Sequence, residues 1–406
     1  MPRPLDAEII AEHVSEIAFL WRVRDLAAAS PGYDASDLAA LDERIDAHLD
    51  GVRIADEAGI AACEGALDPG EPGTAFGLAV FAIERGDGAR LEAALAIADQ
   101  APSASRGVVT ALAWSSANAA APVVRDLLGA GASARRRLGI AASSARREDV
   151  GAALGFAVEA DDPRLRARAL RAIGELGRVD LAREARAAIA SEDEGCAFWA
   201  AWSSTLLGDA GAADALWRVG EGSSPLAPRA AATAVRAFDA RTARERIETL
   251  GAHQEHARAA LMAAAAYGDP ALVPFVLAHL DAPESARAAA DAFARITGAA
   301  IVDELAGDAA AHPSAEDEDD ETDPDEALPW PNPAAITRAW SATLERRLSR
   351  GTRYVGGSPL SGDALRAEIE RGPQHRRASA AIELALLERG RPLAEVRARG
   401  GRAVPR

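Results

Sequence analysis

Residues 161–190 read DDPRLRARALRAIGELGRVDLAREARAAIA, and this stretch decides the fold. Its apolar residues recur every three or four positions on either side of Gly177, which predicts two helices joined by a short turn. Asp162 and Pro163 suit a helix start, because an aspartate caps free N–H groups and a proline fits the first turn.

The same two-helix plan recurs along the chain. Steps of 28 to 32 residues separate eight turn positions, which are Gly86, Asn118, Arg147, Gly177, Gly208, Ala240, Gly268 and Gly298. One such helix pair is too short to bury its apolar face alone, so neighbouring pairs must stack. The spacing therefore predicts an all-α fold, an α-solenoid of about eight helical-hairpin repeats over residues 71–311.

The composition agrees with a helical chain. Of 406 residues, 102 are alanine, none is lysine and only 4% are aromatic. Alanine loses little entropy in a helix, so this composition excludes all-β classes. Cys63 and Cys196 stand far apart, without a Cys or His cluster nearby, which excludes a disulfide framework and a zinc site and favours a reducing, cytoplasmic setting.

The net charge of −17 argues against nucleic acid as a partner, because DNA affinity comes largely from clustered cations. Nine of the 62 aspartates and glutamates fall between Glu316 and Glu326. No apolar stretch reaches the roughly 20 residues that span a bilayer, so we expect no membrane insertion. Acidic residues interrupt the N-terminal stretch, which argues against a signal peptide.

The repeat unit DPRLRARALRAIGELG resembles the HEAT-like repeat of phycobilisome lyases. Flanking stretches are similar to a narrower, uncharacterised proteobacterial family of HEAT-like proteins often encoded near type VI secretion genes. These stretches are LDERIDAHLDGVRIADEAG (41–59), ITGAAI (296–301), LPWPNP (328–333), GTRYVGG (351–357) and QHRRASAAIELALLERGRPLAEVRARG (374–400). The resemblance implies an architecture and a genomic neighbourhood.

Three regions flank the predicted array. Residues 1–70 are expected to form an N-terminal helical cap, with a helix at 6–29 and two more separated by a break near Gly51. Residues 312–333 form an acidic, proline-rich linker, read as a solvated tether, with Ca²⁺ binding as the alternative. Residues 334–406 are expected to form a C-terminal helical cap.

Six residues are candidates for contact with a partner: Trp199, Trp202, Trp330, Trp340, Arg353 and Tyr354. The tryptophans at 199 and 202 could instead pack between repeats. Trp330, held between prolines, could dock into a groove of the solenoid itself or of a partner. Arg353 and Tyr354 follow a helix rich in arginine, where cations could contact an anion or only complement the helix dipole.

The sequence holds no GxSxG, P-loop or GxGxxG motif, and without lysine no Schiff base can form. His253 and His256 match no metal-binding pattern, so we expect no metal, no cofactor and no catalytic residue. The predicted function is a non-catalytic protein-binding scaffold, an accessory, adaptor or effector-handling protein associated with type VI secretion. The alternatives are an immunity protein that neutralises a toxin, and an enzyme on a HEAT scaffold with a metal or base-binding pocket. The oligomeric state stays open.

Overall fold

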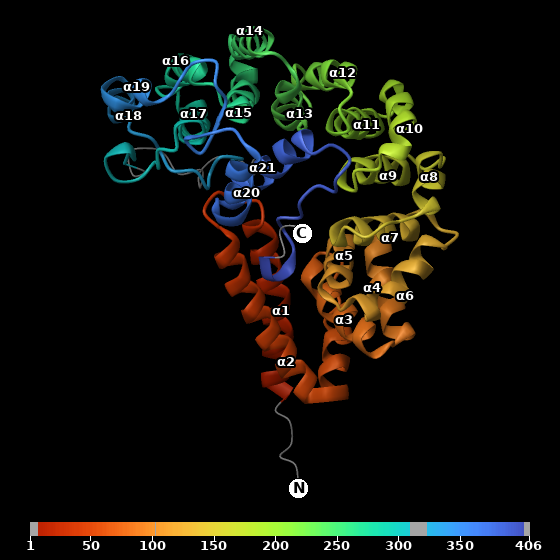
Figure 1. Cartoon of the computed structure of the whole chain (residues 1–406). Helices are drawn as coiled ribbons and strands as arrows, with labels where there is room; N and C mark the ends of the chain where they lie inside the picture. Colours follow the sequence, from red (N-terminus) through yellow and green to blue (C-terminus); the bar gives the residue numbers. More distant parts are fainter. Residues whose placement is uncertain (1–6, 102, 309–322, 402–406) are drawn as a thin grey trace. The chain divides into compact units, whose positions relative to one another are not determined.

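The computed structural model of the chain describes residues 7–101, 103–308 and 323–401. Two compact units are present: unit 1 comprises Met1–Glu184 and Pro392–Arg406, and unit 2 comprises Ala185–Arg391. Both consist mainly of helices packed side by side (Figure 1), which confirms the predicted all-α class.

Unit 1 begins with two long helices and continues with hairpins. Its helices are α1 (Ala7–Ala27), α2 (Ala35–Gly65), α3 (Pro72–Arg85), α4 (Gly88–Gln100), α5 (Ala104–Trp114), α6 (Ala117–Leu128), α7 (Ser133–Arg146), α8 (Ala152–Val158), α9 (Pro163–Glu175), η1 (Val179–Leu181) and η10 (Arg399–Gly401). The boundary between the units falls within α10 (Ala182–Ala187).

Unit 2 continues the hairpin plan and adds a small β-hairpin. Its elements are η2 (Ala188–Ala190), α11 (Glu194–Leu206), α12 (Ala210–Gly220), α13 (Ala227–Ala234), η3 (Val235–Ala237), α14 (Ala240–Gly251), η4 (Gln254–His256), α15 (Ala257–Tyr267), η5 (Pro270–Leu272), α16 (Val273–Leu277), α17 (Pro283–Thr297), η6 (Asp303–Leu305), α18 (Pro333–Ala339), η9 (Trp340–Leu344), α19 (Glu345–Arg347), β1 (Tyr354–Val355), β2 (Ser358–Pro359), α20 (Gly362–Arg371) and α21 (Gln374–Leu387).

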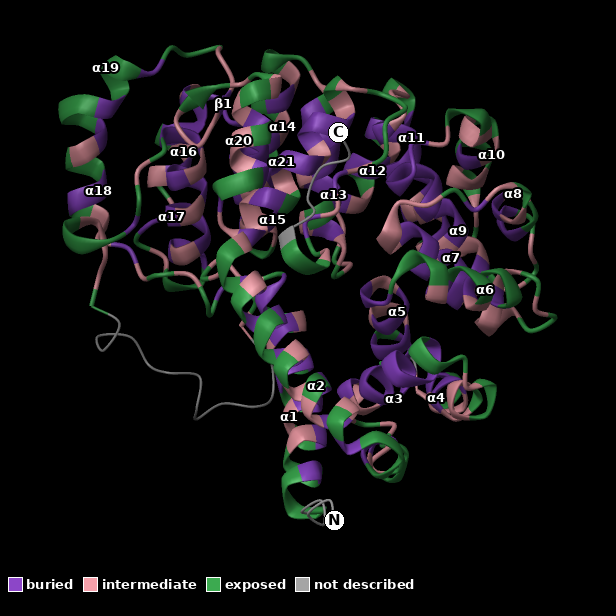
Figure 2. Ribbon diagram, turned by 60° about the horizontal axis from the view of Figure 1, so that its bottom comes forward, coloured by how far each residue is buried: buried purple, intermediate pink, exposed green. Residues whose placement is uncertain are grey.

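Within each unit the first helices of successive hairpins pack on one another and form a buried layer. This layer is α3, α5, α7 and α9 in unit 1, and α11, α13, α15 and α17 in unit 2. The second helices pack against it from one side, and Figure 2 shows their more exposed surfaces. This two-layer arrangement is that of the predicted solenoid repeat.

The repeat turns follow the predicted spacing at six of eight positions, where the residue has a positive φ: Gly86, Arg147, Gly177, Gly208, Gly268 and Gly298. The prediction is wrong at Asn118, which lies inside α6, and at Ala240, which begins α14. There the chain turns just before Ser116 and Asp239, whose side chains cap the following helix.

The predicted helix start at Asp162 is confirmed. Its carboxylate accepts hydrogen bonds from the backbone N–H groups of Arg164 and Leu165, and Pro163 occupies the first helical position. An aspartate side chain likewise caps the start of several other repeat helices, at Asp87, Asp193 and Asp209.

The predicted break near Gly51 is wrong, because α2 continues through it and is interrupted at Asp56, where φ is 50°. Gly51 instead allows a close approach of α1. A Cβ atom at this position would lie 2.5 Å from Nε2 of His13, so no larger residue fits without a shift.

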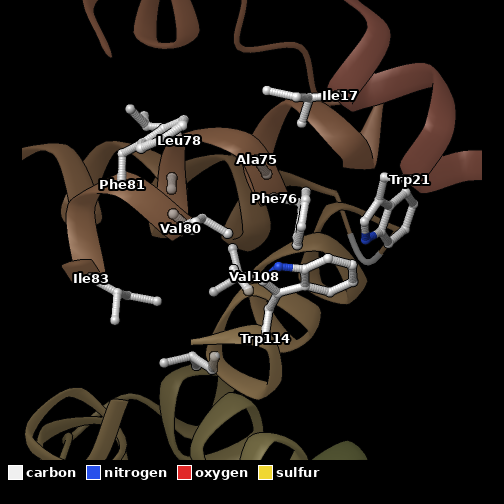
Figure 3. Close-up of a cluster of buried hydrophobic side chains, with 14 of the residues drawn as sticks. Ile17, Trp21, Ala75, Phe76, Leu78, Val80, Phe81, Ile83, Val108 and Trp114 are labelled. Atoms are coloured by element: carbon white, nitrogen blue, oxygen red, sulfur yellow. The ribbon is translucent and has the colours of Figure 1, made fainter. Parts of the chain in front are cut away.

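Large aromatic side chains build the core between the N-terminal helices and the first repeats of unit 1. Figure 3 shows Trp21, Phe76 and Trp114 turned toward one another. The rings of Phe76 and Trp114 meet edge to face with centroids 5.4 Å apart. This cluster joins the predicted N-terminal cap to the repeats, so the cap and the repeats share one core.

The end of the acidic linker is docked on unit 2. Asp325 is buried and receives two 2.9 Å hydrogen bonds from Arg258, while Arg287 pairs with Asp323 and stacks over the Trp330 ring at 4.5 Å. The prediction of a solvated tether is therefore wrong for residues 323–333. Residues 312–322 lie outside the described residues.

The LPWP stretch at the end of this linker docks on the chain itself. The carbonyl of Trp330 accepts a 2.7 Å hydrogen bond from the N–H of Gly307, and the N–H of Asn332 donates to Leu305 at 2.8 Å. These bonds show that the stretch docks on its own chain, which was the first of the two predicted alternatives.

The C-terminal part of the chain is divided between the units. Helices α18, α20 and α21 of unit 2 agree with the helical character predicted for this region, and the stretch GTRYVGGSP contains the β1–β2 hairpin. The described residues from Pro392 to Gly401 belong to unit 1. The prediction of a single C-terminal cap over 334–406 is therefore wrong for its last part.

Candidate functional site

The six predicted contact residues do not form one surface. Three of them are buried, with exposed fractions of 4% for Trp202, 5% for Trp340 and 8% for Tyr354, so these side chains pack inside the chain and their role as partner contacts stays a prediction. Trp202 packs edge-on against Trp199, with centroids 5.4 Å apart. The reason is physical: large rings fill the gaps that alanine leaves between helices.

Trp330 and Trp340 lie near α17 of unit 2. Trp330 lies under the guanidinium of Arg287, and the Trp340 ring meets Phe293 edge to face at 6.4 Å. Both side chains serve to attach the segments after the acidic linker. Of the six, Arg353 and Tyr354 line a cavity together with charged groups.

The β1–β2 hairpin places Arg353. The hairpin backbone runs across the C-terminal ends of α15 and α17. The N–H of Tyr354 donates to the carbonyl of Gly268 at 2.8 Å, and the N–H of Gly356 donates to the backbone carbonyl of Arg295 at 2.9 Å. The C-terminal ends of α15 and α17 therefore also hold this hairpin in place.

Gly268 leaves no room for a side chain. Its φ is +78°, and a Cβ atom would lie 2.1 Å from the carbonyl oxygen of Tyr354. We expect Gly268→Ala to lower the free energy of unfolding of unit 2 by about 1 to 3 kcal/mol, because it adds backbone strain and displaces the hairpin. Gly351→Ala is the matched control, since Gly351 also has a positive φ but nothing within 4 Å of the added atom. Equal losses of urea stability in the two variants would contradict this account.

Four arginines and three carboxylates converge behind the hairpin. We call this site the arginine pocket and define it by Arg236 of η3, Arg295 of α17, Arg353, and Glu368, Arg376, Ser379 and Glu383 of α20 and α21, with Asp291 beside them. The cavity has a volume of about 30 Å³, enough for about two water molecules.

Glu383 and Ser379 each hold two of the arginines. The Oε2 atom of Glu383 accepts from Nε of Arg236 at 3.0 Å and from Nη2 of Arg353 at 2.6 Å. The Ser379 hydroxyl accepts from Arg236 at 2.7 Å and from Arg295 at 2.5 Å. The Arg236 and Glu383 side chains are only 2% and 6% exposed, so the pocket is built on a buried ion pair.

The arginines of the pocket lie close enough together to repel one another. Burial lowers the pKa of Arg236, Glu383 opposes this change, and the charges of Arg295 and Arg353 add to it, which leaves the pKa at about 10. The four guanidinium groups carry one positive charge more than Glu383, Glu368 and Asp291 can balance when all are ionised. An added anion with one negative charge would complete the balance.

Polar atoms at the pocket also remain unsatisfied. Among the described residues, Nε of Arg376 and Oε1 of Glu368 are buried and have no hydrogen-bond partner. Buried polar atoms are normally paired, so these two point to a ligand or water that completes the site. Arg376 can donate to an anion, and Glu368 can accept from a hydroxyl or amide beside it.

Asp291 gives the site an acid-sensitive member. Burial raises its pKa, but the 2.8 Å hydrogen bond with His375 and the charges of His375, Arg295 and Arg376 outweigh burial and lower it to about 2. In unit 1, Arg168, Arg171 and Arg147 likewise overcome burial and lower the pKa of Glu175 to about 2.

These lowered pKa values predict loss of stability in acid. A depressed carboxylate stabilises the folded state above its unfolded pKa, near 4, and this stabilisation is lost as the pH falls from about 4 toward 2. We expect each group to contribute about 2 to 3 kcal/mol. The urea midpoint should fall most steeply between about pH 4 and pH 2, and Asp291→Asn together with Glu175→Gln should flatten that dependence. A dependence that the substitutions leave unchanged would refute the assignment.

Of the residues that line this pocket, the sequence singled out Arg353 and Tyr354. Arg236, Arg295 and Arg376 each lie on a repeat or cap helix, where a single arginine is typical of a solvated face. His253 and His256 lie at the short η4, and among the described residues no three His, Cys, Asp or Glu side chains are placed to hold a metal ion. Within the same residues, no helix combines the length and apolar character needed to cross a membrane.

No family model matches the chain, and no curated protein matches it either. Its function therefore has to be inferred from its own residues and their geometry.

Proposed function

We propose that this chain is a non-catalytic protein-binding scaffold that holds a carboxylate of its partner in the arginine pocket. One observation carries the proposal: four guanidinium groups, one of them almost wholly buried, surround a small cavity with only three carboxylates to balance them. Arginine is suited to this task, because its planar donors match the two oxygens of a carboxylate.

The size and charge of the pocket fit this ligand. A cavity for about two waters accommodates the two oxygens of one carboxylate, and one negative charge neutralises the excess cation. Arg376 supplies the free Nε–H donor. The carboxylate would come from an acidic side chain or a chain terminus of a protein, while the repeated hairpins offer a wider contact surface.

The resemblance to HEAT-like proteins encoded near type VI secretion genes directs the search for that partner. It favours an accessory, adaptor or effector-handling role, in which the scaffold binds a secretion component or an effector. Such a role needs a specific anchor on the partner, and a carboxylate held by several arginines is such an anchor.

A small-molecule test addresses the pocket directly. Sodium acetate at 100 mM should raise the melting temperature above that in equal sodium chloride, because a ligand that binds only the folded state stabilises it. Arg376→Gln should abolish the difference, whereas Arg347→Gln, at an exposed arginine of α19, should keep it. The same acetate effect in both variants would place the binding elsewhere.

The partner itself can be sought with the same residues in charge-reversed form. We expect a protein captured from the native host by the tagged wild-type chain to be retained by Arg347→Glu and lost with Arg376→Glu. Circular dichroism establishes that both variants are folded before the comparison. A partner that Arg376→Glu still captures would exclude the arginine pocket as its anchor.

A further inference from the structure

The segment Leu393–Gly400 is bound to unit 1 as a peptide ligand would be. Figure 1 shows the blue end of the chain beside the red helices α1 and α2. Four hydrogen bonds fasten its backbone: Leu393 N–H to the Glu175 carbonyl at 2.9 Å, Arg147 Nε to the Leu393 carbonyl at 2.5 Å, Arg24 Nη2 to the Arg397 carbonyl at 2.9 Å, and Gly400 N–H to Asp42 Oδ2 at 3.0 Å.

The side chains of this segment alternate in their contacts. Ala394 and Val396 are buried, whereas Glu395, Arg397 and Arg399 form ion pairs. Their partners are Arg147 at 3.1 Å for Glu395, Asp25 at 2.8 Å for Arg397, and Asp46 for Arg399, whose guanidinium also lies 4.7 Å from the centre of the Trp114 ring. Arg397 and Arg399 are thus bound by two separate carboxylates.

The residues that receive the segment are held by contacts of their own. Arg24 and Asp42 form a buried pair, with Nε and Oδ1 2.6 Å apart. The Trp114 indole N–H donates to Asp46 at 3.1 Å. We call these residues, with Asp25 and Arg147, the docking site of unit 1, and these two contacts do not depend on the segment.

The segment itself is held lightly. Its two buried side chains are small, and the side chains of Arg397 and Arg399 remain 47% and 40% exposed. Ion pairs of such exposed side chains contribute little to stability, so the Glu395–Arg147 pair, with side chains 18% and 10% exposed, is the strongest of the three. The chain reaches the docking site through Arg389–Pro392, where all four residues are exposed. Exchange of the segment therefore disturbs little else in unit 1.

We propose that the docking site binds an arginine-containing segment of a partner protein, and that Leu393–Gly400 is its built-in occupant. The partner segment carries two arginines spaced as in VRAR, preceded by small apolar residues, because the carboxylates of Asp25 and Asp46 select this pattern. This site lies in unit 1 and selects cations, so it is independent of the anion-selecting arginine pocket. A partner must displace the resident segment, which lowers its apparent affinity.

The test uses the full-length chain and a fluorescent peptide of residues 391–401. In one variant, Arg397→Glu with Arg399→Glu weakens the resident segment. We expect this variant to bind the peptide roughly 100-fold more tightly than the wild-type chain, since it removes competition from a tethered ligand. Equal binding by the two chains, or no binding to the wild type at any peptide concentration, would overturn the proposal.

A second form of the experiment leaves the sequence of the segment unchanged. A protease site between Gly390 and Arg391 cuts the folded chain without removing the segment, and the peptide should then exchange with it. Asp46→Asn should weaken peptide binding at least about tenfold, and Glu43→Gln, at an exposed acid of α2, should not. Equal affinity for a peptide with both arginines changed to glutamate would also refute selection by Asp25 and Asp46.

Discussion

Replacing Glu383 by glutamine is expected to lower the free energy of unfolding of unit 2 by about 3 to 5 kcal/mol. One carboxylate oxygen of Glu383 receives hydrogen bonds from Arg236 and Arg353. Without that charge, the guanidinium of Arg236 stays buried next to Arg295 and Arg353, which repel it. An uncompensated charge in a low-dielectric site is among the costliest single changes a fold can suffer.

Native-state hydrogen exchange can measure this loss, because it reports the stability of α13, α15 and α21 separately from that of unit 1. Glu370→Gln is the control: its side chain is 71% exposed and pairs only with the neighbouring Arg371 among the ion pairs of the described residues. We expect a change within about 0.5 kcal/mol there. Arg236→Met combined with Glu383→Leu should recover much of the loss, because it removes both charges. A double variant as unstable as Glu383→Gln would contradict the charge argument.

The second large effect concerns unit 1, where Asp42→Asn is expected to cost about 3 to 5 kcal/mol. Arg24 and Asp42 are 6% and 3% exposed, and Arg24 has no other carboxylate within ion-pair distance among the described residues. Asp42 also accepts the N–H of Gly400. The substitution should therefore raise hydrogen exchange in α1 and α2 and also free the 393–400 segment.

Limited proteolysis separates these two consequences. Cleavage after Arg397 should accelerate strongly in Asp42→Asn and stay unchanged in Glu43→Gln. If α1 and α2 lose protection while the segment remains protected, Asp42 stabilises the helices but does not hold the segment.

The repeat architecture was predictable because it depends on patterns within short stretches of sequence. Helical periodicity and the regular spacing of turn residues identify the hairpins, and six turns fall where the spacing places them. The exceptions have local causes: side-chain caps at Ser116 and Asp239 replace a left-handed residue. At Gly51 the missing side chain serves the approach of His13, a contact 38 residues away that no periodicity encodes.

The arginine pocket was largely beyond prediction for the same reason. Arg236 and Glu383 lie 147 residues apart, and a buried arginine looks like a surface one in a helical pattern. Arg353 was singled out because it stands in an unusual turn, outside the repeats. The 393–400 segment has no periodicity at all, so its place in unit 1 is a purely long-range property of the fold.

The division of unit 1 into two stretches of chain has a consequence for synthesis. Domains generally fold as units, and the N-terminal one does so first while the ribosome is still at work. Here Arg24 and Asp42 emerge early, yet the backbone groups of Arg397 and Gly400 that complete their hydrogen bonds emerge only after all of unit 2. The last hydrogen bonds of unit 1 therefore form only after the whole of unit 2 has been synthesised. Until then Asp25, Asp42 and Asp46 on the nascent N-terminal helices lack the contacts that residues 397–400 make with them.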